Sequence, residues 1–179
     1  TVKNLLKYGR NELQIRYDQC FQQKKGYGEQ TDSILSLYPN RKYRGEPFYH
    51  SLRYSYTFED RLQAGFVAEK DAGEPFWNAY HKGYDFYSAH LFLKDINWLK
   101  SLAIGDYKMS FGQGLVISND FSPSRTAVVA QAERRTNGFR RHFSTNEQDF
   151  FRGVASTITI KNLDISVFYS YRKMDAAVD

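Results

Sequence analysis

Apolar and polar residues alternate along most of this chain, which is the two-residue period of a β-strand with two unlike faces. In residues 163–172 every odd position is apolar or aromatic, and every even position except Phe168 is polar. The same pattern predicts eight strands, at 2–7, 11–24, 48–58, 61–70, 84–94, 98–111, 150–160 and 163–173. Most approach the length of about 10 residues that a tilted strand needs to cross a bilayer, whereas strands of soluble proteins average about 5–6.

The connections between these strands alternate between short and long. Short joints are expected at Gly9-Arg10, Glu59-Asp60, 95–97 and Lys161-Asn162, and long loops at 25–47, 71–83 and 112–149. Outer-membrane β-barrels have this arrangement, with short periplasmic turns and long external loops on the other side. The sequence therefore predicts an all-β, antiparallel up-and-down transmembrane β-barrel. Residues 1–179 would form a single barrel domain, or part of one, in a bacterial outer membrane.

The polar face of the predicted strands carries several arginines and carboxylates. An arginine turned toward lipid near the midplane would cost roughly 2–4 kcal/mol, so this face is expected to meet water or other polar groups. The apolar face would then meet lipid. Pairing of opposite charges is expected, because unpaired buried charges are costly. The expected lumen-lining residues are Arg16, Asp18, Arg53, Arg61, Glu69, Arg152 and Arg172.

One segment, 98–119, breaks the strict alternation. Gly105 lies inside the predicted strand, and Gly112 and Gly114 follow soon after. Glycine inside a strand often marks a bulge or a close backbone approach. We therefore expect a kink at Gly105, after which the strand continues through 115–117 above the membrane.

Composition fits strands with two unlike faces. Aromatic residues make up 17% of the chain, with 14 Tyr and 14 Phe, yet the mean hydropathy is −0.63. Aromatic girdles around a polar lumen would explain both values, and so would a β-sandwich with a tyrosine-rich surface. Interfacial aromatic residues are expected at Trp77, Tyr84, Trp98 and Tyr107; packing at the ends of a soluble barrel is the alternative.

The formal net charge of +5 points to nucleic acid, anionic lipid or an anionic solute as a partner. Loop 121–149 is rich in arginine, whose guanidinium group pairs bidentately with phosphates. The loop is expected to contact lipopolysaccharide, or to fold inward as an anion-selecting constriction. A merely solvated loop is the plainer alternative, and Phe139 and Phe143 leave nucleic-acid stacking open. The arginines concerned are Arg134, Arg135, Arg140 and Arg141.

The sequence offers little for catalysis. Cys20 is the only cysteine, which excludes a disulfide framework and a thiolate metal site. The acidic residues between 69 and 85 lack the spacing of an EF-hand loop. Ser88, His90 and Asp85 have the side chains of a hydrolase triad, but no nucleophile elbow is present. We expect a non-enzymatic protein without metal or cofactor, whose partners are outer-membrane lipid, lipopolysaccharide and other envelope proteins.

Several stretches occur together in a familiar combination: 69–76, 84–90, 105–107, 111–115 and 150–155. The set resembles an outer-membrane barrel family of Bacteroidetes-type bacteria, over about residues 8–175. Full-length members typically carry a helix-hairpin-helix segment, similar to that of DNA-uptake competence proteins, ahead of a longer barrel. This chain shows no such segment, so a DNA-binding role tied to it does not carry over. Because the family's barrels are longer than this chain, the resemblance implies a fragment of a larger barrel. It supplies no catalytic residues.

Three functions are compatible with these observations. The first is a barrel that acts as a channel or as a structural component of an envelope assembly. The second is a soluble, lipocalin-like ligand-binding barrel, which would place the apolar faces inside. The third, a barrel module of a DNA-uptake system, is implied by the resemblance alone.

Overall fold

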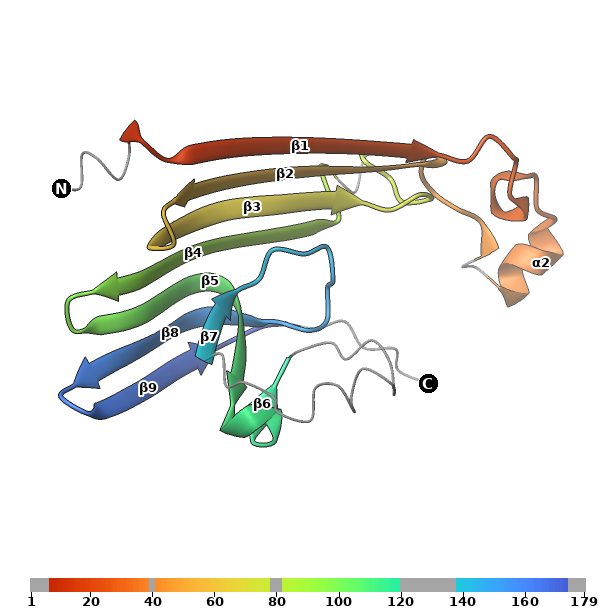
Figure 1. Cartoon of the computed structure of the whole chain (residues 1–179). Helices are drawn as coiled ribbons and strands as arrows, with labels where there is room; N and C mark the ends of the chain where they lie inside the picture. The colour runs from red at the N-terminus through yellow and green to blue at the C-terminus, as the bar shows by residue number, and fades with distance from the viewer. Residues whose placement is uncertain (1–6, 39–40, 78–81, 120–137, 174–179) are drawn as a thin grey trace, which may run out of the picture. The chain divides into compact units, whose positions relative to one another are not determined.

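The computed structural model describes residues 7–38, 41–77, 82–119 and 138–173 (Figure 1). These residues form one nine-stranded sheet, with a short α-helix and two 3₁₀ turns in the connections. The strands are β1 (Arg10–Gln19), β2 (Phe48–Phe58), β3 (Leu62–Lys70), β4 (Phe86–Ile96), β5 (Leu99–Phe111), β6 (Ile117–Ser118), β7 (Gly138–Arg141), β8 (Phe151–Ile160) and β9 (Leu163–Ser170). The helical elements are η1 (Lys25–Tyr27), α2 (Asp32–Leu37) and η3 (Gly112–Gly114).

The prediction of an all-β, antiparallel meander is confirmed for the described residues. The sheet order is β1-β2-β3-β4-β5-β8-β9, so its main strands follow one another in chain order, while β6 and β7 both pair with β5. The sheet is not closed within the described strands, because β1 and β9 remain at its two edges. The predicted strand at 2–7 lies almost wholly outside the described residues. The segment predicted at 11–24 ends earlier, at Gln19, and α2, β6 and β7 were not predicted.

The predicted short turns between long strands are confirmed. They join β2 to β3, β4 to β5 and β8 to β9. Four residues in or beside these turns have positive φ: Glu59 (46°), Asp95 (52°), Asn97 (53°) and Lys161 (56°). Asn and Asp tolerate this left-handed conformation better than most residues, because their short polar side chains can hydrogen-bond locally.

The described residues fall into two compact units, whose boundary crosses β1, β2, β3 and β4. Unit 1 contains residues 7–12, 55–66, 88–119 and 138–173, and with them β5 to β9. Unit 2 contains residues 13–38, 41–54, 67–77 and 82–87, including the connections that follow β1 and β3. Each unit is described by itself below.

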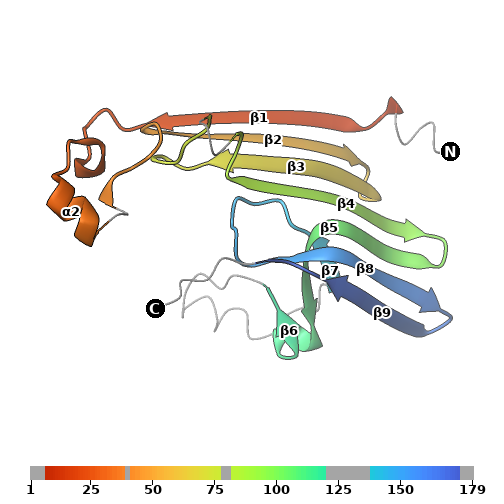
Figure 2. The same ribbon diagram turned by 180° about the vertical axis from the view of Figure 1, so that it is seen from behind.

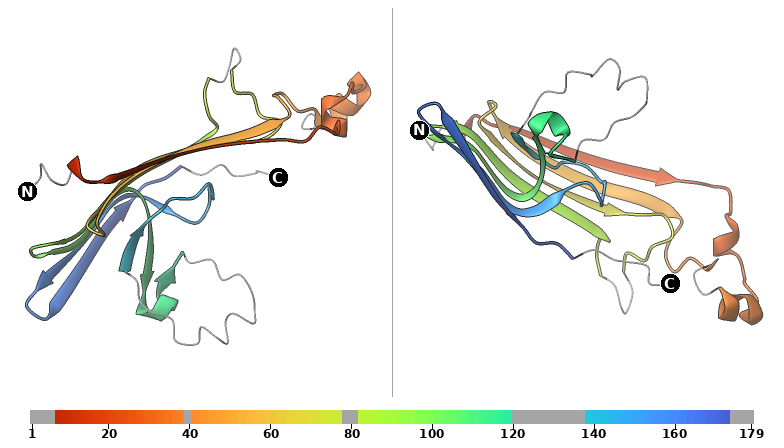
Figure 3. Two further views of the ribbon diagram at one scale, coloured as in Figure 1. Left: turned by 45° about the horizontal axis from the view of Figure 1, so that its top comes forward. Right: turned by 90° about the horizontal axis from the view of Figure 1, so that it is seen from below.

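In unit 1, β5 changes its pairing partner at Gly105. Before it, β5 pairs with β4, up to the His90–Gly105 pair; after it, Tyr107 and the next three residues pair with β7. Gly105 has φ 91°, and a Cβ atom there would lie 2.3 Å from the carbonyl oxygen of Ala89. Only glycine fits so close an approach with this backbone conformation. The change of partner agrees with the predicted kink at Gly105, and Figure 3 shows β5 curving along its length.

The expectation that the strand continues through 115–117 is wrong. Gly112 (φ 61°) and Gly114 (φ 77°) form a 3₁₀ turn that reverses the chain. The next residues return as β6, which pairs with the end of β5 through Ser110–Ser118 and Phe111–Ile117. Two glycines with freely accessible positive φ permit this reversal, which a continuing strand would not need.

The end of β5 and β7 build a small apolar core on one face of unit 1. Figures 1 and 2 show β7 beside β5. Phe139 of β7 packs edge-on against Tyr107, with ring centroids 6.0 Å apart, and against Phe111 at 5.1 Å. The buried members are Phe92, Ala103, Tyr107, Met109, Phe139 and Ala155, with Phe111, Ile117 and Phe151 packed against them. A segment predicted to be loop therefore contributes the centre of this core.

Candidate functional site

Rows of cross-strand neighbours show that the sheet of unit 1 has two unlike faces. The apolar row leaves three of its four side chains exposed to the outside, whereas the polar row on the opposite face includes buried hydroxyls. This is the division that the alternation predicted. The apolar row is Leu91, Ile104, Val154 and Tyr169, and the polar row is Lys94, Ser101, Thr157 and Ser166.

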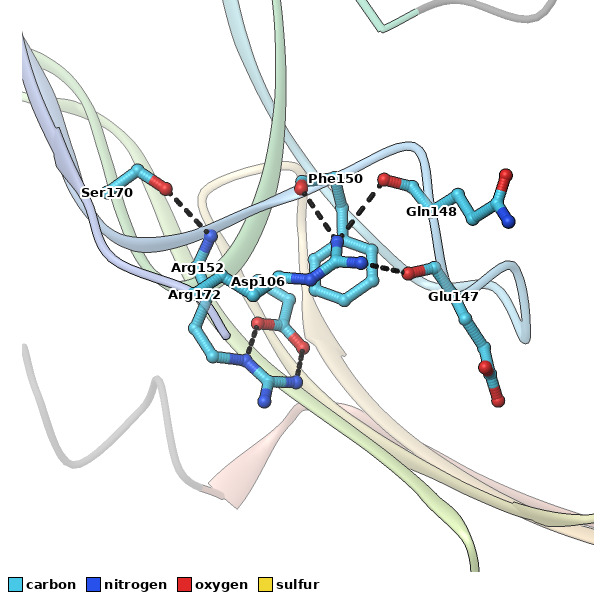
Figure 4. Close-up of polar contacts among 7 residues, drawn as sticks. All are labelled: Asp106, Glu147, Gln148, Phe150, Arg152, Ser170 and Arg172. Carbon is cyan, nitrogen blue, oxygen red and sulfur yellow. Dashed lines mark hydrogen bonds and ion pairs between the residues drawn. The ribbon is translucent and has the colours of Figure 1, made fainter. Parts of the chain in front are cut away.

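A bidentate ion pair lies where β5 and β8 separate. Asp106 and Arg152 are cross-strand partners, and the Arg152 Nε and Nη2 atoms donate to the two Asp106 carboxylate oxygens at 2.6 and 2.8 Å (Figure 4). The Asp106 side chain is only 1% exposed, while that of Arg152 is 45% exposed. A carboxylate this deeply buried needs such a partner, because an unpaired charge there would be very costly.

A second arginine fixes the segment that leads into β8. Arg172 Nη1 donates to the carbonyl oxygens of Gln148 and Phe150 at 3.2 and 3.1 Å, and Nη2 donates to that of Glu147. Its guanidinium carbon lies 4.1 Å from the centre of the Phe150 ring, and that of Arg152 lies 5.5 Å away. The two predicted lumen arginines therefore meet at one aromatic ring, with which both can form cation–π contacts.

Two histidines are buried beside this network. His142 is stacked on Phe150 with ring centroids 4.4 Å apart, and its backbone N–H donates to the Asp106 carbonyl oxygen at 3.0 Å. His90 packs edge-on against Phe143 at 5.4 Å. Among the described residues, no hydrogen-bond partner is found for any of the four ring nitrogens. Burial lowers the pKa of His142 from 6.5 to about 4, so this histidine is neutral at physiological pH.

The arginines of β7 add positive charge to this part of unit 1. Arg140 and Arg141 are half-buried and pair in register with Lys108 and Tyr107 of β5. The Arg141 guanidinium lies 5.3 Å from the Phe143 ring. Within the described part of the chain, Asp106 is the only buried carboxylate, so cations outnumber acids here. The other two predicted loop residues, Arg134 and Arg135, lie outside the described residues.

The remaining predicted lumen residues are not gathered at this network. Arg61 belongs to unit 1 but is exposed in the turn before β3, with its Nε 3.9 Å from a Glu59 carboxylate oxygen. In unit 2, Arg16 pairs with Asp18 at 2.6 Å and lies over the Tyr49 ring at 5.3 Å. Arg53 and Glu69 of the same unit are half-buried.

The predicted interfacial aromatics divide into exposed and buried ones. Trp77 and Trp98 are exposed, and Tyr84 is half-buried, in ring contact with His50, Phe76 and Tyr87 of unit 2. Tyr107 is fully buried, and its hydroxyl donates to the Tyr169 carbonyl oxygen at 3.1 Å. Tyr107 therefore belongs to the core of unit 1 and is not available for an interfacial girdle.

Sequence reasoning missed two buried ionic residues. The sequence does not single out Asp106, since nothing local identifies Arg152 as its partner. Lys70 of unit 2 is fully buried; its Nζ donates to the Phe48 carbonyl oxygen at 3.0 Å and lies 3.5 Å from a Glu46 carboxylate oxygen. The only available indication was a charged residue at a position whose neighbours on the same face are apolar.

Comparison with models of known families, with curated proteins and with solved structures finds no match to this chain. Among the described residues, no group of three or more His, Cys, Asp or Glu side chains could hold a metal ion. No helix within the described ranges has the length and apolar character needed to span a membrane.

Proposed function

We propose that this chain is a non-enzymatic outer-membrane β-barrel protein whose β7 segment folds against the lumen face and makes the lumen attractive to anions. The observation that carries the proposal is the pair of unlike faces in unit 1. The apolar face is left open, while the polar face is the one that β7 covers.

The open apolar face favours a lipid environment over water. Ile104, Val154 and Tyr169 are neighbours across three strands and are 41%, 46% and 69% exposed. Soluble monomers rarely expose contiguous apolar surface of this kind. A soluble lipocalin-like barrel would direct these side chains inward, around a ligand. Their exposure therefore favours a membrane protein.

Insertion into lipid sets a requirement on the edges of the sheet. Every backbone N–H and C=O group in the hydrocarbon region must be hydrogen-bonded within protein, so an open strand edge is not viable there. The edges formed by β1 and β9 therefore need partner strands. Under the proposal these come from beyond the described strands or from a second copy, in keeping with the resemblance to a family of larger barrels.

The cationic β7 segment supports anion attraction. Lys108 and Arg140 are cross-strand partners, Arg141 follows Arg140 in β7, and Arg172 holds the start of β8 through three backbone carbonyls. Rings of Arg or Lys side chains favour anions in pores. The same arginines would suit lipopolysaccharide phosphates only if they faced the outer surface, whereas β7 packs into the core through Phe139.

Detergent dependence and ion selectivity test the proposal. The purified chain should require detergent to stay in solution, and in planar bilayers under a KCl gradient it should conduct Cl⁻ in preference to K⁺. Arg141→Gln should shift the reversal potential toward zero, while Arg10→Gln, an exposed arginine near the start of β1, should leave it unchanged. A soluble monomer without detergent would refute the membrane assignment, and cation selectivity would refute the role of β7.

A further inference from the structure

A cavity of about 580 Å³ opens on the polar face of unit 1, between the sheet and β7. Its lining comes from five strands, β4, β5, β7, β8 and β9. It is distinct from the Asp106–Arg152 network, none of whose residues line it. Its size lies within the range of about 300–1,000 Å³ that is usual for small-molecule sites.

One wall of the cavity is a row of hydroxyl groups. Ser101, Thr157 and Ser166 are cross-strand neighbours on β5, β8 and β9. The Thr157 Oγ1 and Ser166 Oγ atoms are 2.9 Å apart and form a hydrogen bond. Each hydroxyl can donate one hydrogen bond and accept others, so the row can bind a ligand that offers both donors and acceptors.

The charged groups in the lining cancel one another. Lys100 Nζ lies 2.5 Å from an Asp164 carboxylate oxygen, whose other oxygen accepts a hydrogen bond from Thr159 at 2.7 Å. Lys94 and Asp95, at the end of β4, supply one further charge of each sign. A register irregularity between residues 99 and 101 leaves Lys100 as an extra residue in β5, which places it beside the hydroxyl row. The balanced charge gives an ionic ligand no advantage.

The opposite wall is aromatic. Phe139 and Phe111 line the cavity with their rings in an edge-to-face arrangement, centroids 5.1 Å apart. Phe139 is fixed by the apolar core, whereas Phe111 is half-buried. Aromatic side chains give large, rigid apolar contact surfaces, which suit the C–H face of a sugar ring.

We infer that this cavity binds a neutral saccharide of one or two rings. Such a molecule has hydroxyl edges for the row formed by Ser101, Thr157 and Ser166, and C–H faces for the phenylalanines. Pockets that combine apolar surface with convergent polar groups are typical ligand sites. The inference goes beyond the proposed channel, because it requires only the fold of unit 1.

Saturation-transfer NMR on the whole chain tests the inference. The protein is prepared in an amine-oxide detergent, which carries no sugar head group, and is titrated with maltose, with N,N′-diacetylchitobiose and with gluconate as an anionic comparator. At least one neutral disaccharide should bind with a Kd of about 1–10 mM, more tightly than gluconate. Thr157→Val keeps the shape of the side chain and removes its hydroxyl, and it should weaken binding about fivefold or more, a change of about 1 kcal/mol.

Ser156→Ala is the matched control, because Ser156 pairs with Leu102 and Val167 on the apolar face, and it should bind like the parent. Phe111→Leu should weaken binding as Thr157→Val does; if it fails to fold, Ser166→Ala takes its place. No transfer to either disaccharide at about 50 mM would overturn the inference. So would gluconate binding as tightly as the sugars, or unchanged affinity in Thr157→Val. Conductance is measured separately, so loss of the saccharide site would leave the channel proposal standing.

Discussion

The ion pair between Asp106 and Arg152 predicts an asymmetric response to mutation. Arg152→Met removes the ion-pair partner of Asp106, a carboxylate that is 1% exposed. Breaking a buried pair in this way costs about 3–5 kcal/mol, because a charge is left buried without compensation. Asp106→Asn leaves Arg152 without its carboxylate, but that guanidinium is 45% exposed and can turn to water. The expected cost is then about 1–2 kcal/mol, close to the value of a hydrogen bond to a charged group.

Urea unfolding in detergent micelles, followed by tryptophan fluorescence, measures both effects. The double variant Asp106→Asn/Arg152→Met should be destabilised by less than the sum of the single variants, with a coupling of about 1.5–3 kcal/mol. Arg10→Met is the control, since the side chain of Arg10 is largely exposed and its change should stay within about 0.5 kcal/mol. Equal costs for the two single variants, or full additivity, would refute the reasoning from burial.

Three further predictions concern other parts of the molecule. The pKa of His142 is lowered to about 4 in the folded protein, so as the pH falls the unfolded chain takes up a proton at this histidine before the folded protein does. The free energy of unfolding should therefore decline from about pH 6.5 to pH 4, by up to about 3 kcal/mol. In urea titrations, His142→Phe should remove this part of the acid sensitivity. Gly105→Ala should destabilise the protein by more than about 2 kcal/mol, because the new Cβ would clash with a backbone oxygen of β4 and because φ is positive. Gly28→Ala is the control and should cost far less, since the atom nearest to its new Cβ is 3.5 Å away. After Cys20→Ser, a spin label at Leu91 should report lipid contact in electron paramagnetic resonance; a packed protein interior at that position would contradict the membrane orientation.

The candidate site was only partly predictable. Arg172 was identified as a residue of the polar face because its strand alternates clearly, and Arg152 was expected to line the lumen. Their shared contact with Phe150 was not foreseen, because it depends on the chain curling back just before β8. Asp106 lies 46 residues from Arg152, and only the β5–β8 register makes them partners.

The sequence by itself determined the main strands, the short turns between them and the alternation of their two faces. β2 lies at residues 48–58 as predicted, because a two-residue period and turn residues are local properties of the chain. Tertiary structure decided the rest: the reversal after β5, the place of β7 over the polar face, and the cavity beneath it. These features depend on contacts between residues far apart in sequence, and such contacts are set by how strands pair and pack rather than by the period of any one segment.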